Sequence, residues 1–124
     1  MEQTLKEYTE EQATVFTVLS DPTRLRLVKL LCRQRDQDAL CVNALAGFLE
    51  VTQSAVSQHL RILKSIGLVT GERRGYHIHY FVNHETLEYC RNLVSAVLTI
   101  EEPGKEETGE INCPIRRKKN APSR

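Results

Sequence analysis

The spacing of apolar residues in the middle of the chain predicts an amphipathic helix. Val56, Leu60 and Leu63 recur at the interval of one helical face, so they would pack against a core. Thr52 precedes this stripe as a candidate N-cap, and Gly67 follows it as a candidate stop. Because apolar residues resume directly after the glycine, the pattern predicts a strand there.

The opposite side of this predicted helix is polar and carries no carboxylate. Ser, Gln and Arg side chains hydrogen-bond to phosphates and base edges, whereas a carboxylate would repel the phosphate backbone. The candidate DNA-reading residues are Gln53, Ser54, Ser57, Gln58 and Arg61. Many solvated helix faces are also rich in Ser and Gln, so this helix alone leaves both interpretations open.

The residues on either side of this helix favour DNA binding. Val42, Leu45, Ala46 and Leu49 follow a helical spacing, and only residues 50–52 separate them from the next helix. Two short helices joined by so short a turn form a helix-turn-helix, whose second helix enters the major groove.

The residues after the candidate reading helix predict a β-hairpin. Residues 68–72 and 76–82 read as two strands, and Gly75 suits the tight turn between them. We expect Arg73 and Arg74 at the tip, where they would contact a flanking phosphate or the minor groove. The predicted fold is therefore mainly α with a small β-hairpin, a winged helix-turn-helix.

Three segments in combination resemble the ArsR/SmtB family of bacterial repressors. They are residues 19–27, which include Asp21-Pro22-Thr23-Arg24, and residues 53–60 and 63–69. The resemblance covers roughly residues 12–98. It implies a cytoplasmic homodimer that occupies operator DNA until an inducer binds, with the first and last helices forming the dimer interface.

The helices outside the reading motif supply the expected scaffold. A first helix begins near Tyr8 or Glu10, and a last helix spans about residues 85–100. Between them, residues 25–32 are apolar around most of the helix, so we expect this element to be the buried centre. Cys32 and Cys90 lie on apolar stripes, where a cysteine is usually a small buried hydrophobe.

Composition and charge agree with a single small DNA-binding domain. The chain has 124 residues and is 40% hydrophobic, and no apolar run approaches the ~20 residues that span a bilayer. The four cysteines are scattered, and we expect no signal peptide, which suits a reducing cytosol. Residues 53–82 carry a net charge of +3, whereas residues 1–21 carry −4, so the basic side is the candidate DNA side.

The sequence changes character near residue 102, which sets the expected domain boundary. Residues 1–102 form the predicted DNA-binding and dimerisation domain. Residues 103–110 have no apolar side chain and residues 116–119 are all basic, so we expect 103–124 to be a flexible charged tail.

The sequence leaves the identity of the inducer open. In many members of the family a Cys-Val-Cys motif supplies two thiolates, but here Cys41 is followed by Val42 and Asn43. A soft-metal or arsenite site usually needs two or three thiolates. The candidate ligands that remain are Cys41, Cys90 and Cys113, so one alternative is a metal, metalloid or thiol-redox sensor that uses Cys41 with Cys90 or Cys113.

A second alternative is a winged helix that binds a protein partner without selective DNA binding. An enzyme is not expected, because no activated nucleophile or acid–base pair is evident in the sequence.

Overall fold

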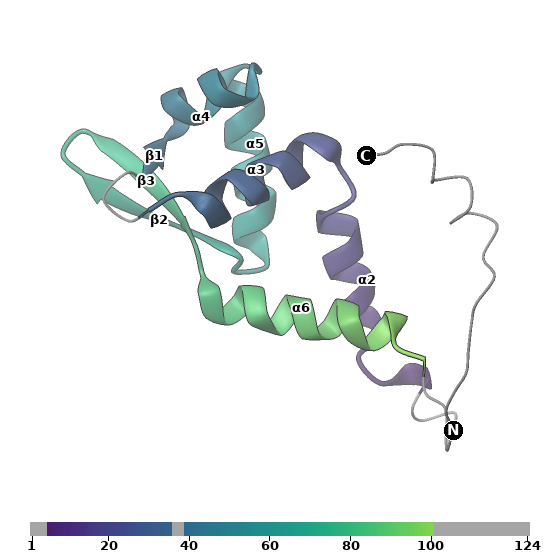
Figure 1. The fold of residues 1–124 in the computed structure, drawn as a ribbon. Helices are drawn as coiled ribbons and strands as arrows, with labels where there is room; N and C mark the ends of the chain where they lie inside the picture. Colours follow the sequence, from purple (N-terminus) through teal and green to yellow (C-terminus); the bar gives the residue numbers. More distant parts are fainter. Residues whose placement is uncertain (1–4, 36–38, 101–124) are drawn as a thin grey trace.

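The computed structural model describes residues 5–35 and 39–100 of the chain, which fold into a helical body with a small sheet projecting from it (Figure 1). The helices of these ranges are α2 (Thr9–Val18), α3 (Pro22–Arg33), α4 (Val42–Leu49), α5 (Gln53–Ser65) and α6 (His84–Leu98). The strands are β1 (Leu40–Cys41), β2 (Val69–Arg74) and β3 (His77–Val82). The predicted winged helix-turn-helix architecture is confirmed, whereas the expected tail lies outside the described residues.

The core lies where α3, α4 and α5 face one another and the base of the sheet. Leu27 of α3, Leu45 of α4 and Leu63 of α5 are completely buried. Helix α3 buries only one side, through Leu27 and Leu31, and both Leu25 and Cys32 are exposed. The prediction that this helix would be buried around most of its girth is therefore wrong, because its neighbours cover a single face of it.

Each of three helices begins with a side chain that accepts backbone N–H groups. Asp21 accepts the N–H of Arg24 at 3.0 Å, and Pro22 occupies the first helical position, where a missing donor costs nothing. Thr52 accepts the N–H of Ala55 at 3.0 Å. Asn83 accepts two N–H groups, those of Glu85 and Thr86. These caps fix where α3, α5 and α6 start.

The sheet has three antiparallel strands in the order β1-β3-β2, one strand more than the predicted hairpin. In the added pairing, Leu40 lies opposite Tyr80 and Cys41 opposite His79. The Gln34 side chain joins both strands, because its amide donates to the Tyr80 carbonyl at 2.6 Å and accepts the Leu40 N–H at 3.1 Å. A strand of two residues has no periodicity, so the sequence pattern could not reveal it.

The hairpin turn is formed by Gly75 and Tyr76, not by the arginines. Gly75 has φ of 70°, as the first central residue of a type II′ turn requires. Arg73 and Arg74 are still within β2, opposite Ile78 and His77. The expectation that the two arginines would occupy the tip is therefore wrong, because the turn starts two residues later, at Gly75, and both arginines end β2.

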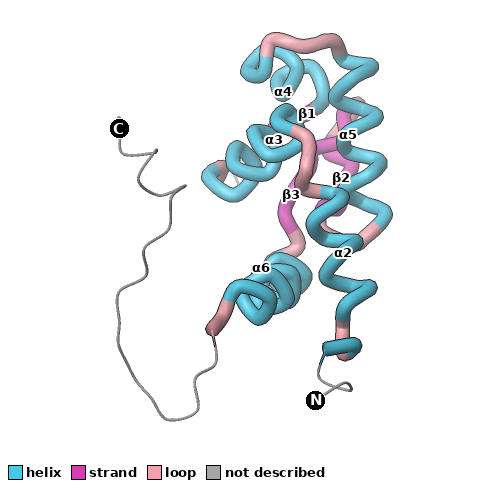
Figure 2. Tube along the Cα trace, turned by 90° about the vertical axis from the view of Figure 1, so that its right-hand side faces the viewer, coloured by secondary structure: helices cyan, strands magenta, loops and turns pink. Residues whose placement is uncertain are grey.

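Helices α2 and α6 pack together at the end of the body farthest from the hairpin tip (Figures 1 and 2). Val15 and Val18 of α2 and Cys90 and Leu93 of α6 are buried, and the Gln12 amide donates to the Leu93 carbonyl at 3.2 Å. None of the described helices is both long enough and apolar enough to cross a bilayer.

Replacing Thr52 with Ala should lower the free energy of unfolding by about 1 kcal/mol, because the Ala55 N–H loses its acceptor. Urea unfolding followed by circular dichroism measures the change. Ser57→Ala is the matched control, since it removes an exposed hydroxyl from the same helix without touching the cap. A loss of equal size in both variants would contradict the capping role.

Candidate nucleic-acid interface

The five predicted reading residues of α5 all lie on its exposed side. The reason is that Val56, Leu60 and Leu63 are buried, which turns the intervening positions toward solvent. Helix α5 contains no Asp or Glu at any position, so nothing on it repels phosphate. The exposed set consists of Gln53, Ser54, Ser57, Gln58 and Arg61.

A tight turn sets the angle between α4 and α5. Glu50 adopts a left-handed conformation with φ of 57°, and its N–H bonds to the Gly47 carbonyl at 3.3 Å. The next N–H, that of Val51, bonds to the Ala46 carbonyl at 3.2 Å. These two bonds terminate α4, and Thr52 starts α5 immediately afterwards. The helix pair therefore has the short connection that the sequence predicted.

His59 on α5 contacts residues at the beginning of α3. Its Nδ1 lies 3.1 Å from Nη1 of Arg24, and its Nε2 lies 3.8 Å from Oδ2 of Asp21. A guanidinium only donates, so Nδ1 of His59 is the acceptor in this contact. Arg24 also donates from Nε to the Val18 carbonyl at 2.6 Å. One arginine thus connects α2, α3 and α5.

The hairpin is seated on the end of α5 by an aromatic ring. Tyr80 is buried, and Nζ of Lys64 lies 5.8 Å from the centre of its ring. Gly71 on the neighbouring strand lies against this ring and against Ile78, since a Cβ there would come within 2.9 Å of Cγ2 of Ile78 and 3.1 Å of Cε1 of Tyr80. A larger residue at this position would have to displace one of these two side chains. The hairpin and α5 are therefore in contact through the Tyr80 ring and Lys64.

The two arginines of β2 have different surroundings. Arg74 donates to Glu72 at 3.2 Å, and its guanidinium carbon lies 4.8 Å from the centre of the Phe81 ring. Arg73 is exposed. Stacking and pairing hold Arg74 along the strand, whereas Arg73 can extend toward a phosphate.

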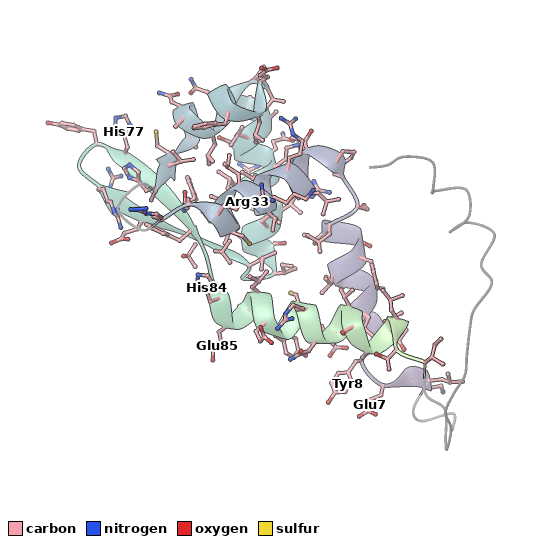
Figure 3. The ribbon with its side chains drawn as sticks, in the orientation of Figure 1. Glu7, Tyr8, Arg33, His77, His84 and Glu85 are labelled. Atoms are coloured by element: carbon pink, nitrogen blue, oxygen red, sulfur yellow. The ribbon has the colours of Figure 1, made fainter. Side chains whose placement is uncertain are left out.

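Tyr76 is a surface residue at the hairpin tip that the sequence analysis did not single out. It is 96% exposed, and the exposed His77 follows it at the outer end of the hairpin (Figure 3). A tyrosine so exposed on the turn of a wing is a candidate DNA contact. Its position next to Gly75 could have indicated this, had the turn been assigned to Gly75-Tyr76.

The described thiols are kept apart by the fold. Cys41 lines a hollow of about 310 Å³ between the hairpin and the start of α5, whereas Cys90 lines an apolar hollow of about 490 Å³ beside α6. Burial raises the pKa of the Cys90 thiol, which disfavours the thiolate that metals bind. Cys113 lies outside the described residues, and Cys32 is exposed, contrary to expectation.

No three His, Cys, Asp or Glu side chains within residues 5–35 and 39–100 are grouped closely enough to hold a metal ion. His79 lies opposite both Cys41 and Glu72 in the sheet register, and its Nδ1 is buried without a hydrogen-bond partner in the described part of the chain. The predicted candidate ligand Cys41 therefore has one imidazole beside it in the sheet, and Cys90 is on another element.

Comparisons with known proteins agree with this geometry. A family model described as bacterial regulatory protein, arsR family, matches residues 21–70. A transcriptional repressor SmtB homolog of Synechocystis is 45% identical over 57% of this chain, which spans about half of that relative's length (51%). The arsenical resistance operon repressor of Bacillus subtilis is 35% identical over 68% of this chain and 78% of its own length.

Among solved structures, a similar one is the homodimeric winged helix-turn-helix DNA-binding domain of a Mycobacterium bovis protein. It matches with a TM-score of 0.57 and 30% identity, over 74% of this chain and 82% of that one. Residues 21–70, which the family model matches, include both helices of the helix-turn-helix.

Stability should depend on pH through Asp21. The backbone N–H of Arg24, above all, lowers the pKa of the Asp21 carboxyl from its ordinary value. The charged form therefore stabilises the fold fully above the ordinary pKa of about 3.9, and this contribution is lost as the pH falls through the lowered value. Asp21→Asn keeps a capping oxygen but removes the charge, so it should unfold more easily than the parent at pH 7.

Urea unfolding of both proteins at pH 7 and at pH 2.5 measures the difference. We expect the gap between parent and Asp21→Asn to shrink at the acidic pH, because protonation removes charge from the Asp21 carboxyl as the pH falls. A gap of constant size would show that the charge of Asp21 does not stabilise α3.

Proposed function

Because this chain belongs to the ArsR family of bacterial regulatory proteins, we propose that it is a homodimeric transcriptional repressor that leaves its operator when an inducer binds. The observation that carries the proposal is the exposed, carboxylate-free face of α5, held between a tight helix turn and a seated hairpin. Gln53, Ser54, Ser57, Gln58 and Arg61 read the major groove in this proposal. Arg73 and Arg74 contact the backbone or the minor groove beside it.

Exposed apolar side chains on α2 and α6 support dimerisation. Phe16, Tyr89, Val97 and Leu98 all remain exposed in the single chain, and a surface of this kind favours association with a second copy. The Mycobacterium bovis neighbour is described as homodimeric. In the proposed dimer the two α5 helices meet successive major grooves about 34–36 Å apart, and an inducer acts by changing that spacing.

The place of action follows from the proposed function. A regulator that occupies bacterial operators works in the cytoplasm, where the DNA and the transcription machinery are. The family relatives are transcriptional regulators, and an enzymatic activity is not part of the proposal. A metal or thiol-redox inducer that uses Cys41 with Cys90 requires thiols from separate elements, or from two subunits, to meet.

The first experiment is fluorescence anisotropy with the reduced protein. One labelled duplex is the DNA upstream of its own gene, the other is a scrambled duplex of the same composition, and both are titrated across a salt series. We expect binding to the upstream DNA to be at least a hundred-fold tighter at physiological salt. Equal and weak binding to both duplexes would favour the protein-interaction alternative, or a repressor whose operator lies elsewhere.

Arg61→Ala should weaken binding to the preferred duplex by about 1–3 kcal/mol while leaving the scrambled duplex almost unaffected. The physical reason is that a guanidinium on the exposed face of α5 can make a bidentate contact with a guanine. The same anisotropy titration measures it, with Ser65→Ala at the far end of the helix as the control. A uniform loss on every sequence would make Arg61 a phosphate contact.

The two hairpin arginines should differ in their effect on salt dependence. Arg73→Ala should reduce the slope of log affinity against log salt by about 0.9 per subunit, because one phosphate contact is lost. Arg74→Ala should change it less, since Arg74 is occupied by Glu72 and Phe81. An unchanged slope in Arg73→Ala would exclude Arg73 from the DNA contact.

A further inference from the structure

The side of α3 that faces away from the core is basic. Arg26, Lys29 and Arg33 recur at helical spacing, and all three are exposed, whereas Leu27 and Leu31 on the opposite side are buried (Figure 3 labels Arg33). None of the three cations forms an ion pair with a residue in the described ranges. We call this surface the α3 basic face, consisting of Arg26, Lys29 and Arg33.

Apolar side chains lie directly beside these cations. The α3 basic face borders a hollow of about 250 Å³ between α3 and α4, together with Leu30, Phe48 and Leu49. Phe48 is 63% exposed, which is unusual for a phenylalanine on a folded helix. A partner that fits this surface is acidic and carries an aliphatic side chain for the hollow.

The C-terminal segment of the chain has this composition. Residues 101–110 contain five glutamates and one lysine, a net charge of −4. Ile111 and Ile115 follow directly. The order along the chain, acidic and then aliphatic, matches the cations and the adjoining hollow.

We propose that residues 101–115 dock on the α3 basic face, with glutamates of 101–110 pairing with its cations and Ile111 or Ile115 in the hollow beside Phe48. This inference does not depend on the proposed DNA binding.

Residues 101–113 are long enough to extend from residue 100 to the α3 basic face. The structure describes the chain up to residue 100, and thirteen residues of extended chain, 101–113, span up to about 45 Å. A domain of about 100 residues has a radius of gyration of about 13 Å, which corresponds to a diameter of about 34 Å. Because the segment is tethered, its local concentration is of millimolar order, so individually weak ion pairs suffice for docking.

The position of the α3 basic face argues for the chain's own segment over DNA as its occupant. Figure 2 shows α3 and α5 on opposite sides of the body, and the buried side of α3 is turned toward the core that α5 shares. The cations therefore point away from the face on which α5 presents its reading residues. DNA held by α5 would lie on the other side of the body.

Two native cysteines provide the test. Cys32 is exposed on α3 between Lys29 and Arg33, and Cys113 lies between the two isoleucines of the segment. The full-length protein is treated with the thiol oxidant diamide, digested without reduction, and its cross-linked peptides are quantified by mass spectrometry. We expect the Cys32–Cys113 peptide to exceed the Cys41–Cys113 peptide at least five-fold, and to decline at least three-fold in 1 M salt.

Charge variants make the test specific. The triple variant Arg26→Glu, Lys29→Glu and Arg33→Glu should lose the Cys32–Cys113 peptide at least five-fold. A second triple change in the same protein, Glu106→Lys, Glu107→Lys and Glu110→Lys, should restore it by exchanging the charges. The matched control reverses Arg61, Lys64 and Arg73, three exposed cations on the DNA-reading side, and should leave the yield unchanged.

Either of two results would overturn the proposal. One is a Cys113 that links to Cys32 no more often than to Cys41. The other is a Cys32–Cys113 yield that is the same before and after charge reversal, in variants whose circular dichroism confirms a native fold. Neither result would bear on DNA binding, because the anisotropy assay is separate.

Discussion

Helix α5 can bury only one of its faces, and this constraint organises the whole domain. Val56, Leu60 and Leu63 must enter the core, which leaves a single rotational setting for the helix. In that setting every hydroxyl, amide and guanidinium of the reading set is in solvent. The same apolar contacts that hold the fold together therefore determine which side chains can reach a base pair. A rotation by one residue would bury polar groups without partners, at a cost of several kcal/mol.

Long periodic elements were predictable from the sequence because their buried residues recur at the helical period. Helices α4 and α5 and the turn between them lie where the apolar intervals placed them. What the pattern could not reveal depends on contacts between distant residues. The strand at Leu40 and Cys41 exists because β3 and the Gln34 amide are there to receive it. Likewise, α3 has apolar residues such as Leu25 that remain 41% exposed, so the composition of the helix overstated its burial.

In the candidate site, too, some features follow from residue spacing and others depend on contacts between distant residues. Residue type and helical phase were enough to name the exposed side of α5. They were not enough to separate Arg73 from Arg74, because the difference between them is made by Phe81 and Glu72 on the folded hairpin. His59 had no distinguishing signal either, since its role comes from Arg24, thirty-five positions earlier in the chain.

The Gln34 amide lies between the end of α3 and the hairpin. It is bonded to the Tyr80 carbonyl and to the Leu40 N–H, so it clamps the root of the hairpin to the end of α3, while Gly75 and Tyr76 at the far end are in solvent. The hairpin is thus a cantilever with a fixed root and a free tip. In such a lever a small tilt at the root becomes a larger displacement at the tip, in proportion to its length. A shift of the end of α3 would therefore tilt the hairpin where Gln34 holds it, and the exposed ring of Tyr76 would be displaced farthest.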